Sequence, residues 1–143
     1  MAWAIVDSGV YIGHWEYGLS VEVLDSITRP FVLRQSAVVL SELRRGAQSR
    51  MARRLVETLA KHAAIVWTPT VDDWWEAARL IQDIGDREGW DRSKRRSFQN
   101  DALIALTARR HGAAVITTNR ADFDLLAGEL GIAIVPVAGR ALP

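Results

Sequence analysis

The chain contains no cysteine among its 143 residues, which excludes both disulfide bonds and thiolate zinc sites. Any bound metal ion must therefore be held by oxygen or imidazole ligands. The sequence also lacks a long apolar run behind a basic amino terminus, so we expect neither a signal peptide nor a membrane span, and a cytoplasmic location. The net charge is only +1, which means that local clusters, and not bulk charge, must attract any nucleic acid.

The remaining composition is that of an ordinary folded domain. Hydrophobic residues make up 49% of the chain and charged residues 24%, far from disordered or fibrous compositions. A chain of this length buries enough surface for one core. We therefore expect a single domain over residues 1–143, with no repeat and no linker.

Short apolar runs alternate with longer amphipathic segments along the sequence. The apolar runs predict five strands at 3–6, 31–33, 64–67, 113–117 and 132–135. The amphipathic segments predict helices at 13–24, 36–46, 48–62, 71–88, 98–111 and 121–130, with a polar loop at 89–96. Such alternation favours a parallel α/β sheet, joined by right-handed crossovers and covered by helices on both faces.

Acidic side chains stand where this topology would gather them. Asp7 ends the first strand, and the turn with Asn119 and Asp122 follows the fourth, so the two turns meet if these strands are neighbours. Glu42 and Asp101 lie in helices that can reach the same edge. Carboxylates so close together repel one another unless a hard cation such as Mg²⁺ or Mn²⁺ neutralises them. Such a metal site could activate water and hydrolyse a phosphodiester bond.

Each of these residues also has a simpler structural interpretation. In this interpretation Asp7 is only a helix cap, Glu42 is a solvated helix charge, and Asp101 is part of a helix cap with its neighbour Asn100. Asn119 and Asp122 have the spacing of a capping pair. The combination of the motifs, and no single one, indicates a catalytic site.

The order and spacing of these motifs resemble the PIN domain family, and more closely the VapC toxins of bacterial type II toxin–antitoxin pairs. The likeness covers nearly the whole chain. It rests on four segments, Ile5-Val6-Asp7-Ser8, residues 36–46, residues 100–105, and Thr117-Thr118-Asn119 followed by Asp122-Phe123.

The resemblance implies a three-layer PIN-like sandwich with a five-stranded parallel sheet. It also implies a homodimer, a cognate VapB-like antitoxin, and magnesium-dependent cleavage of RNA, commonly transfer or ribosomal RNA, in which Mn²⁺ may replace Mg²⁺. A non-catalytic PIN-like module that binds RNA or protein is the alternative. A receiver-like protein phosphorylated on Asp7 is a third possibility, which the absence of a late strand-terminal lysine disfavours.

By position, Asp7, Glu42 and Asp101 match the first three acidic residues of the family. The fourth position is shared, because relatives carry the acid either where this chain has Asn119 or where it has Asp122. We assign Asp122 to the catalytic and metal-binding set, and the supporting positions are Asn119, Thr117 and Ser8.

Two basic clusters offer contacts for a polyanion. The first precedes the helix of Asp101 and is expected to hold RNA phosphates: Arg92, Lys94, Arg95 and Arg96. The second follows Glu42 and suits either RNA or an acidic antitoxin segment: Arg44, Arg45, Arg50, Arg53 and Arg54.

The chain has six tryptophans, which is many for its length. Trp3 and Trp67 in strands and Trp74 on an apolar helical face are expected to pack in the core or in a dimer interface. An exposed Trp15 or Trp90 could instead stack on an unpaired base. The three histidines have no metal-ligand spacing.

Overall fold

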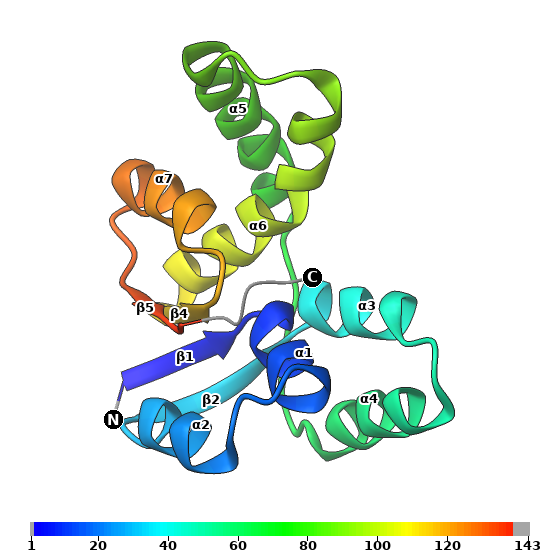
Figure 1. The fold of residues 1–143 in the computed structure, drawn as a ribbon. Helices are drawn as coiled ribbons and strands as arrows, with labels where there is room; N and C mark the ends of the chain where they lie inside the picture. Colours follow the sequence, from blue (N-terminus) through cyan, green and yellow to red (C-terminus); the bar gives the residue numbers. More distant parts are fainter. Residues whose placement is uncertain (1, 139–143) are drawn as a thin grey trace.

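A computed structural model describes residues 2–138, which form a five-stranded sheet with helices on both sides (Figure 1). All strand pairs are parallel, and the order across the sheet is β3-β2-β1-β4-β5. The strands are β1 (Ala2–Val6), β2 (Phe31–Ser36), β3 (Val66–Trp67), β4 (Ala114–Thr117) and β5 (Ile134–Pro136). The first and fourth strands are neighbours, which is the condition for their two polar turns to meet, and both end at the same edge.

Seven helices occur within residues 2–138. They are α1 (Ser8–Glu16), α2 (Val21–Thr28), α3 (Ala37–Gly46), α4 (Arg50–His62), α5 (Val71–Glu88), α6 (Arg92–His111) and α7 (Arg120–Leu130). In Figure 1, α5 and the start of α6 project from one end of the molecule, and α3 and α4 lie on the side toward which β1 points.

Two apolar clusters give the molecule its three layers. Ile5 and Val115 face a large core built mainly from α3, α5, α6 and α7, in which Phe98 and Leu103 are fully buried. The neighbouring strand residues point the other way, and a smaller cluster there contains Val10 of α1. This alternation is what a sheet buried on both faces requires, so the predicted three-layer α/β class is confirmed.

The helix predicted at 13–24 is wrong, because two helices with a break between them occupy this region. The helix α1 begins directly after Asp7, and Gly18 then adopts a left-handed backbone with φ 80°. Ser20 starts α2 by accepting a hydrogen bond from the Val23 amide. The amphipathic pattern continues across the break, so the spacing of apolar residues did not predict it.

The polar loop predicted at 89–96 is also wrong from Arg92 onward. Asp91 accepts a hydrogen bond from the Lys94 amide and caps α6, whose first turns are the basic run itself. Lysine and arginine are good helix formers, so their polarity did not mean a loop.

Three strands differ in extent from the prediction. The strand β2 reaches Ser36, β3 is only two residues long, and β5 includes Pro136, where a break was expected. β5 is an edge strand, where the missing N–H of a proline costs no ladder hydrogen bond. No helix within residues 2–138 is both long and apolar enough to cross a membrane.

Trp74 was predicted to pack in the core or in a dimer interface, and the structure excludes the core. Trp74 is 51% exposed and its neighbour Trp75 is 83% exposed, whereas Trp67 is buried and stacks on Trp3. Trp15 and Trp90, proposed as exposed stacking residues, are partly buried.

Candidate active site

Asp7 stands at the centre of the site, directly after β1. Its backbone amide donates to the carbonyl oxygen of Ile116 at 2.9 Å, which extends the β1–β4 ladder and holds Asp7 beside the end of β4. The Oδ1 atom accepts from the Ser8 amide at 2.8 Å, and Oδ2 accepts from the Thr117 hydroxyl at 2.8 Å. Asp7 therefore caps α1 and faces the β4 turn at the same time, so the cap and the site role do not exclude each other.

Burial makes the Asp7 carboxylate costly to ionise. Only 5% of the residue is exposed, and desolvation raises the pKa of Asp7 above its usual value, opposed by the hydrogen bonds from Thr117 and Ser8.

Glu42 projects from the middle of α3 toward this position. Burial and the nearby charge of Asp7 raise its pKa, while the side chains of Asn100 and Ser8 and the charge of Arg45 favour its ionised form. Its Oε1 atom is buried and has no hydrogen-bond partner. A buried carboxylate oxygen without a donor is costly, so Glu42 is not the solvated helix charge of the simpler interpretation.

Asp101 lies well inside α6 and meets the other acids from that side. Burial, followed by the charges of Asp7, Asp122 and Glu42, raises the pKa of Asp101 to about 8, and the charge of Lys94 opposes this. The helix-cap interpretation of Asp101 is wrong, because α6 begins nine residues earlier at Arg92. The raised pKa is the effect of like charges that share one partly desolvated space.

Asn119 connects the two outer carboxylates. Its Nδ2 group donates to Asp101 Oδ2 at 3.2 Å and to Asp122 Oδ2 at 3.1 Å, and its Oδ1 accepts from the Asp122 amide at the start of α7. The Asn119 amide in turn donates to the Thr117 hydroxyl at 2.9 Å. One chain of hydrogen bonds thus runs from Asp7 through Thr117 and Asn119 to Asp101 and Asp122.

Lys94 closes the site on the α6 side. Its Nζ group donates to Asp122 at 2.9 Å (Oδ1) and 2.7 Å (Oδ2), and lies 5.1 Å from the centre of the Trp90 ring. This ion pair neutralises one charge of the acidic group.

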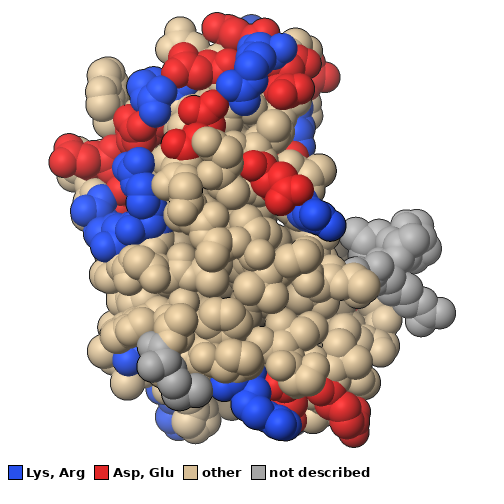
Figure 2. Space-filling model, turned by 90° about the vertical axis from the view of Figure 1, so that its left-hand side faces the viewer, with Lys and Arg blue, Asp and Glu red and all other residues tan. Residues whose placement is uncertain are grey.

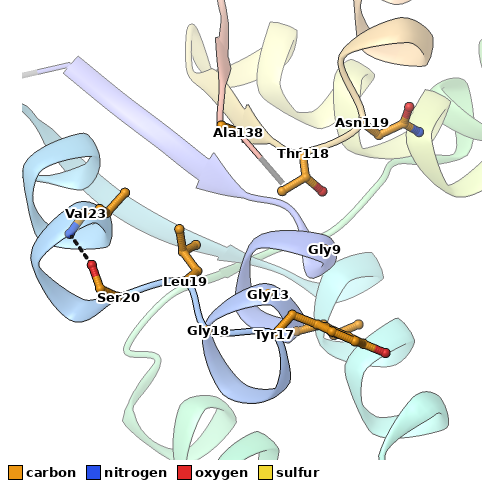
Figure 3. A pocket seen from close by; sticks show the side chains of 11 residues that line it. Gly9, Gly13, Tyr17, Gly18, Leu19, Ser20, Val23, Thr118, Asn119 and Ala138 are labelled. Carbon is orange, nitrogen blue, oxygen red and sulfur yellow. Dashed lines mark hydrogen bonds between the residues drawn. The ribbon is translucent and has the colours of Figure 1, made fainter. Parts of the chain in front are cut away.

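A cavity of about 1040 Å³ borders the site between α1, α2 and the turn after β4 (Figure 3). Leu19 and Val23 line one side of it, with Thr118 and Asn119 on the other. Gly9 lets the two sides approach, because an added Cβ there would lie 2.6 Å from the Thr118 hydroxyl. The turn that bears Asn119 therefore depends on glycine at this position.

The chemistry of these donors fits a divalent cation. Four carboxylates share the site, one has an orphaned oxygen, and three have raised pKa values, all of which a cation would relieve. The side chains are nonetheless turned toward Thr117, Asn119 and Lys94. Within residues 2–138, no three acidic or histidine side chains are gathered closely enough to coordinate one ion.

Comparison with known proteins assigns the fold. The family model described as PIN domain matches residues 4–129. The chain belongs to the PIN domain family. The comparison with curated proteins finds no significant match.

Solved structures agree with this PIN domain assignment. VapBC-1 from nontypeable Haemophilus influenzae is similar with a TM-score of 0.67 and 17% identity, covering 94% of this chain and 97% of that chain. VapBC-5 from Mycobacterium tuberculosis, a member of a family of toxin–antitoxin systems, has a TM-score of 0.60 and 25% identity over 96% of this chain and 100% of that chain. FitAcB from Neisseria gonorrhoeae has a TM-score of 0.63 and 14% identity, covering 92% of this chain and 96% of that chain.

The PIN domain thus brings together most of the residues that the sequence singled out. Gathered at the carboxyl edge are Asp7, Ser8, Glu42, Asp101, Thr117, Asn119 and Asp122. Of the basic run, Lys94 joins the acids, whereas Arg95 binds Asp86 and the Trp90 carbonyl oxygen. RNA binding by Arg92, Lys94, Arg95 and Arg96 stays a prediction.

The pairing of Lys94 with Asp122 was not predicted from the sequence. Lys94 and Asp101 are seven residues apart, which places them on one face of a helix, two turns from each other. Assigning residues 89–96 to a loop concealed that relation. Asn100, next to Asp101, was considered only as a helix cap, but its side chain favours the ionised form of Glu42.

Proposed function

We propose that this PIN domain is a VapC-like toxin, a magnesium-dependent endoribonuclease that hydrolyses RNA phosphodiester bonds. Family membership supports nuclease activity. The observation that carries the proposal is the meeting of Asp7, Glu42, Asp101 and Asp122 at the carboxyl edge of β1 and β4. Phosphodiester hydrolysis is the chemistry that such a group of acids serves when a hard cation is bound.

Asp7, Glu42, Asp101 and Asp122 are the residues that would hold the metal ion. A bound Mg²⁺ supplies a water of lowered pKa and compensates the charge that develops on the scissile phosphate. The orphaned Oε1 of Glu42 and the raised pKa of Asp101 support this assignment, because both report negative charge without a counter-ion.

The supporting residues of this chain hold the acids in place. Thr117 and the Ser8 amide fix both oxygens of Asp7, so the carboxylate has one orientation. Asn119 donates to two acids at once and keeps them from turning to solvent. Lys94 holds Asp122 and limits the net charge that the substrate phosphate must approach.

A cleavage assay tests the reaction class and the substrate together. Purified protein is incubated with a labelled single-stranded RNA and with the DNA of the same sequence, in Mg²⁺ or in excess EDTA. We expect internal cleavage of the RNA in Mg²⁺, none in EDTA, and little cleavage of the DNA. Cleavage that persists in EDTA, or no cleavage of any RNA supplied, including transfer and ribosomal RNA, would contradict the proposal.

One observation favours the alternative of a non-catalytic PIN-like module. The carboxylates do not converge to coordinating positions among residues 2–138. Calorimetric titration with Mn²⁺ separates the two functions, because the nuclease requires the metal and the module does not. Heat that saturates and disappears in Asp101→Asn supports the nuclease, whereas no binding up to millimolar Mn²⁺ favours the module.

We further propose that the protein is neutralised by a VapB-like antitoxin and forms a homodimer. The apolar cavity beside Asn119 supports antitoxin binding, because a partner seated there would lie next to the acids. The exposed Trp74 and Trp75 on α5 support a dimer surface, since large apolar side chains seldom face water together without a partner. A small reading frame directly upstream that encodes a DNA-binding antitoxin is the expected genetic context.

A further inference from the structure

The unit formed by α3 and α4 carries a concentration of positive charge that the proposed mechanism does not use. Between residues 43 and 62 there are six basic residues and a single acidic one, Glu57. Five of the basic residues are arginines, and all five are exposed: Arg44, Arg45, Arg50, Arg53 and Arg54. The rest of the chain balances this excess, since the net charge is only +1.

These five arginines differ from several others in the protein, which are paired with acidic side chains. None of the salt bridges among residues 2–138 involves any of the five. In contrast, Arg79 pairs with Glu76 and Asp83, and Arg87 pairs with Glu129. Figure 2 shows the side that lies to the left in Figure 1, where positive and negative side chains are mixed over the α5–α6 end.

Three of the arginines line a pocket of about 340 Å³ between the two helices. Arg44, Arg45 and Arg53 surround it, with Ala47 and Val56 as apolar wall and Glu57 as the acid. Arg53 Nε donates to the Ala47 carbonyl oxygen at 3.3 Å, so one guanidinium is already held in place. One guanidinium group can donate two parallel hydrogen bonds to a phosphate. A guanidinium that is already held in place loses less side-chain conformational entropy on binding.

The pocket is connected to the candidate active site through α3. Glu42 lies on this helix, and Arg44 and Arg45 follow within the next turn. Burial and the charge of Asp7 raise the pKa of Glu42, and the charge of Arg45 is close enough to oppose this rise. An RNA strand with its scissile phosphate beside the carboxylates therefore passes near these arginines if it runs along α3.

We propose that the pocket lined by Arg44, Arg45 and Arg53 binds backbone phosphates of the RNA strand on one side of the cleavage site. This rests on the proposed ribonuclease function and names a second contact region for the same substrate. The positive charge, the small apolar wall for a ribose, and the position on the helix of Glu42 favour RNA over an acidic protein segment.

Salt dependence of RNA binding tests this directly. Binding of a labelled single-stranded RNA is measured by fluorescence anisotropy in EDTA, over a range of salt concentrations, for wild type and Arg44→Gln/Arg53→Gln. Each lost phosphate contact on single-stranded nucleic acid reduces the slope of log K against log salt by about 0.7. We expect the slope to become shallower by about 1.4.

Two controls make the result specific. Arg79→Gln removes an exposed arginine that is already paired with acids, and we expect the wild-type slope. Arg44→Lys/Arg53→Lys keeps the charge, and we expect it to restore most of the slope. Thermal denaturation of each variant shows that it is folded.

An unchanged slope in folded Arg44→Gln/Arg53→Gln would overturn the proposal. A second result would also overturn it. If wild type binds an oligoglutamate peptide and Arg44→Gln/Arg53→Gln does not, while the variant binds RNA at the wild-type level, the pocket is assigned to an acidic protein partner. RNA binding is measured in EDTA, where no cleavage is expected, so the slope does not depend on catalysis. Failure to cleave RNA would contradict the proposed function, whereas an unchanged slope would contradict only the proposed phosphate contacts.

Discussion

The carboxyl group of Asp101 couples stability to pH. Its pKa in the folded protein is about 8, against 3.8 for an ordinary aspartate, so the folded state binds this proton more tightly than the unfolded state. The free energy of unfolding of the metal-free protein therefore falls as pH rises from about 4 to 8. Asp7 and Glu42 act in the same direction because their pKa values are also raised.

Asp101→Asn should remove much of this penalty. We expect the metal-free variant to be more stable than wild type at pH 8, on the order of 2 kcal/mol, and similar to it at pH 4. Denaturant unfolding at the two pH values measures the difference. Asp124→Asn, which changes an exposed carboxylate on α7, is the control and should show no such pH-dependent gain. A variant less stable than wild type at pH 8 would contradict the account.

Lys94 acts as an internal counter-ion, so the effect of its removal on stability should depend on whether a metal ion is bound. Lys94→Met leaves Asp122 without its ammonium partner, which we expect to cost roughly 1–2 kcal/mol in the metal-free protein at pH 8. Added Mn²⁺ should restore most of the lost Tm, because it supplies the missing positive charge. Lys61→Met, at the other lysine of the chain, should change neither value. An equal loss of Tm with and without Mn²⁺ would mean that Lys94 is only structural.

At this scale the sequence predicted the acids well and their partners poorly. Asp7 was found because it ends a strand, and Glu42 and Asp101 were singled out mainly because their positions match the acidic residues of the family. The Lys94–Asp122 pair joins residues 28 positions apart through the packing of α6 against α7, which no local pattern reveals.

Among the helices, α5 and α6 are joined by an ion pair between a buried aspartate and an exposed arginine. Asp73 and Thr70 form a capping box at the start of α5, and Arg110 near the end of α6 donates to both residues. Only 3% of Asp73 is exposed. One side chain thus starts a helix and ties it to its neighbour.

Asp73→Ala should therefore be strongly destabilising. It removes the helix cap and the hydrogen bonds that Arg110 donates to a buried carboxylate, and we expect a loss of roughly 2 kcal/mol in unfolding free energy. Asp83→Ala, which breaks an exposed pair with Arg79 on the same helix, should cost less than about 1 kcal/mol. Equal effects of the two variants would contradict the role assigned to Asp73.

Several helix ends with a distinct chemical signal were predicted accurately, whereas the caps Ser20 and Asp91 were overlooked. Residues 71–88 matched α5 because Thr70 and Gly89 mark its limits, and Gly112 marked the end of α6. The start of α6 was missed because its first turns are charged, and the break at Gly18 was missed because apolar spacing continues across it.

The assembly of the whole molecule is expected to depend on α5. Val71 and Trp75 are 84% and 83% exposed there, and Trp74 is 51% exposed. If they form the proposed dimer surface, Trp75→Glu should shift the protein from dimer to monomer in light scattering. Met51→Glu, at an apolar residue that is 73% exposed on α4, should leave the dimer intact. A monomeric wild type, or a dimeric Trp75→Glu protein, would contradict this.

For the molecule as a whole, the alternation of apolar runs was enough to predict a parallel α/β sheet, but the position of β1 beside β4 was left as a condition. Surface features such as the exposed tryptophans were not predictable, because a sequence pattern shows which residues share a helix face and not what covers that face.

The most direct test of the central claim is RNA cleavage by wild type and Asp101→Asn, measured side by side in Mg²⁺. Asp101 is surrounded by the other acids, and the amide removes its charge while keeping its size and a hydrogen-bonding oxygen for Asn119. We expect the folded variant to lose at least about 100-fold in rate, in line with the several kcal/mol that metal-assisted stabilisation supplies. Equal cleavage by the two proteins would show that the acidic site is not the site of the reaction.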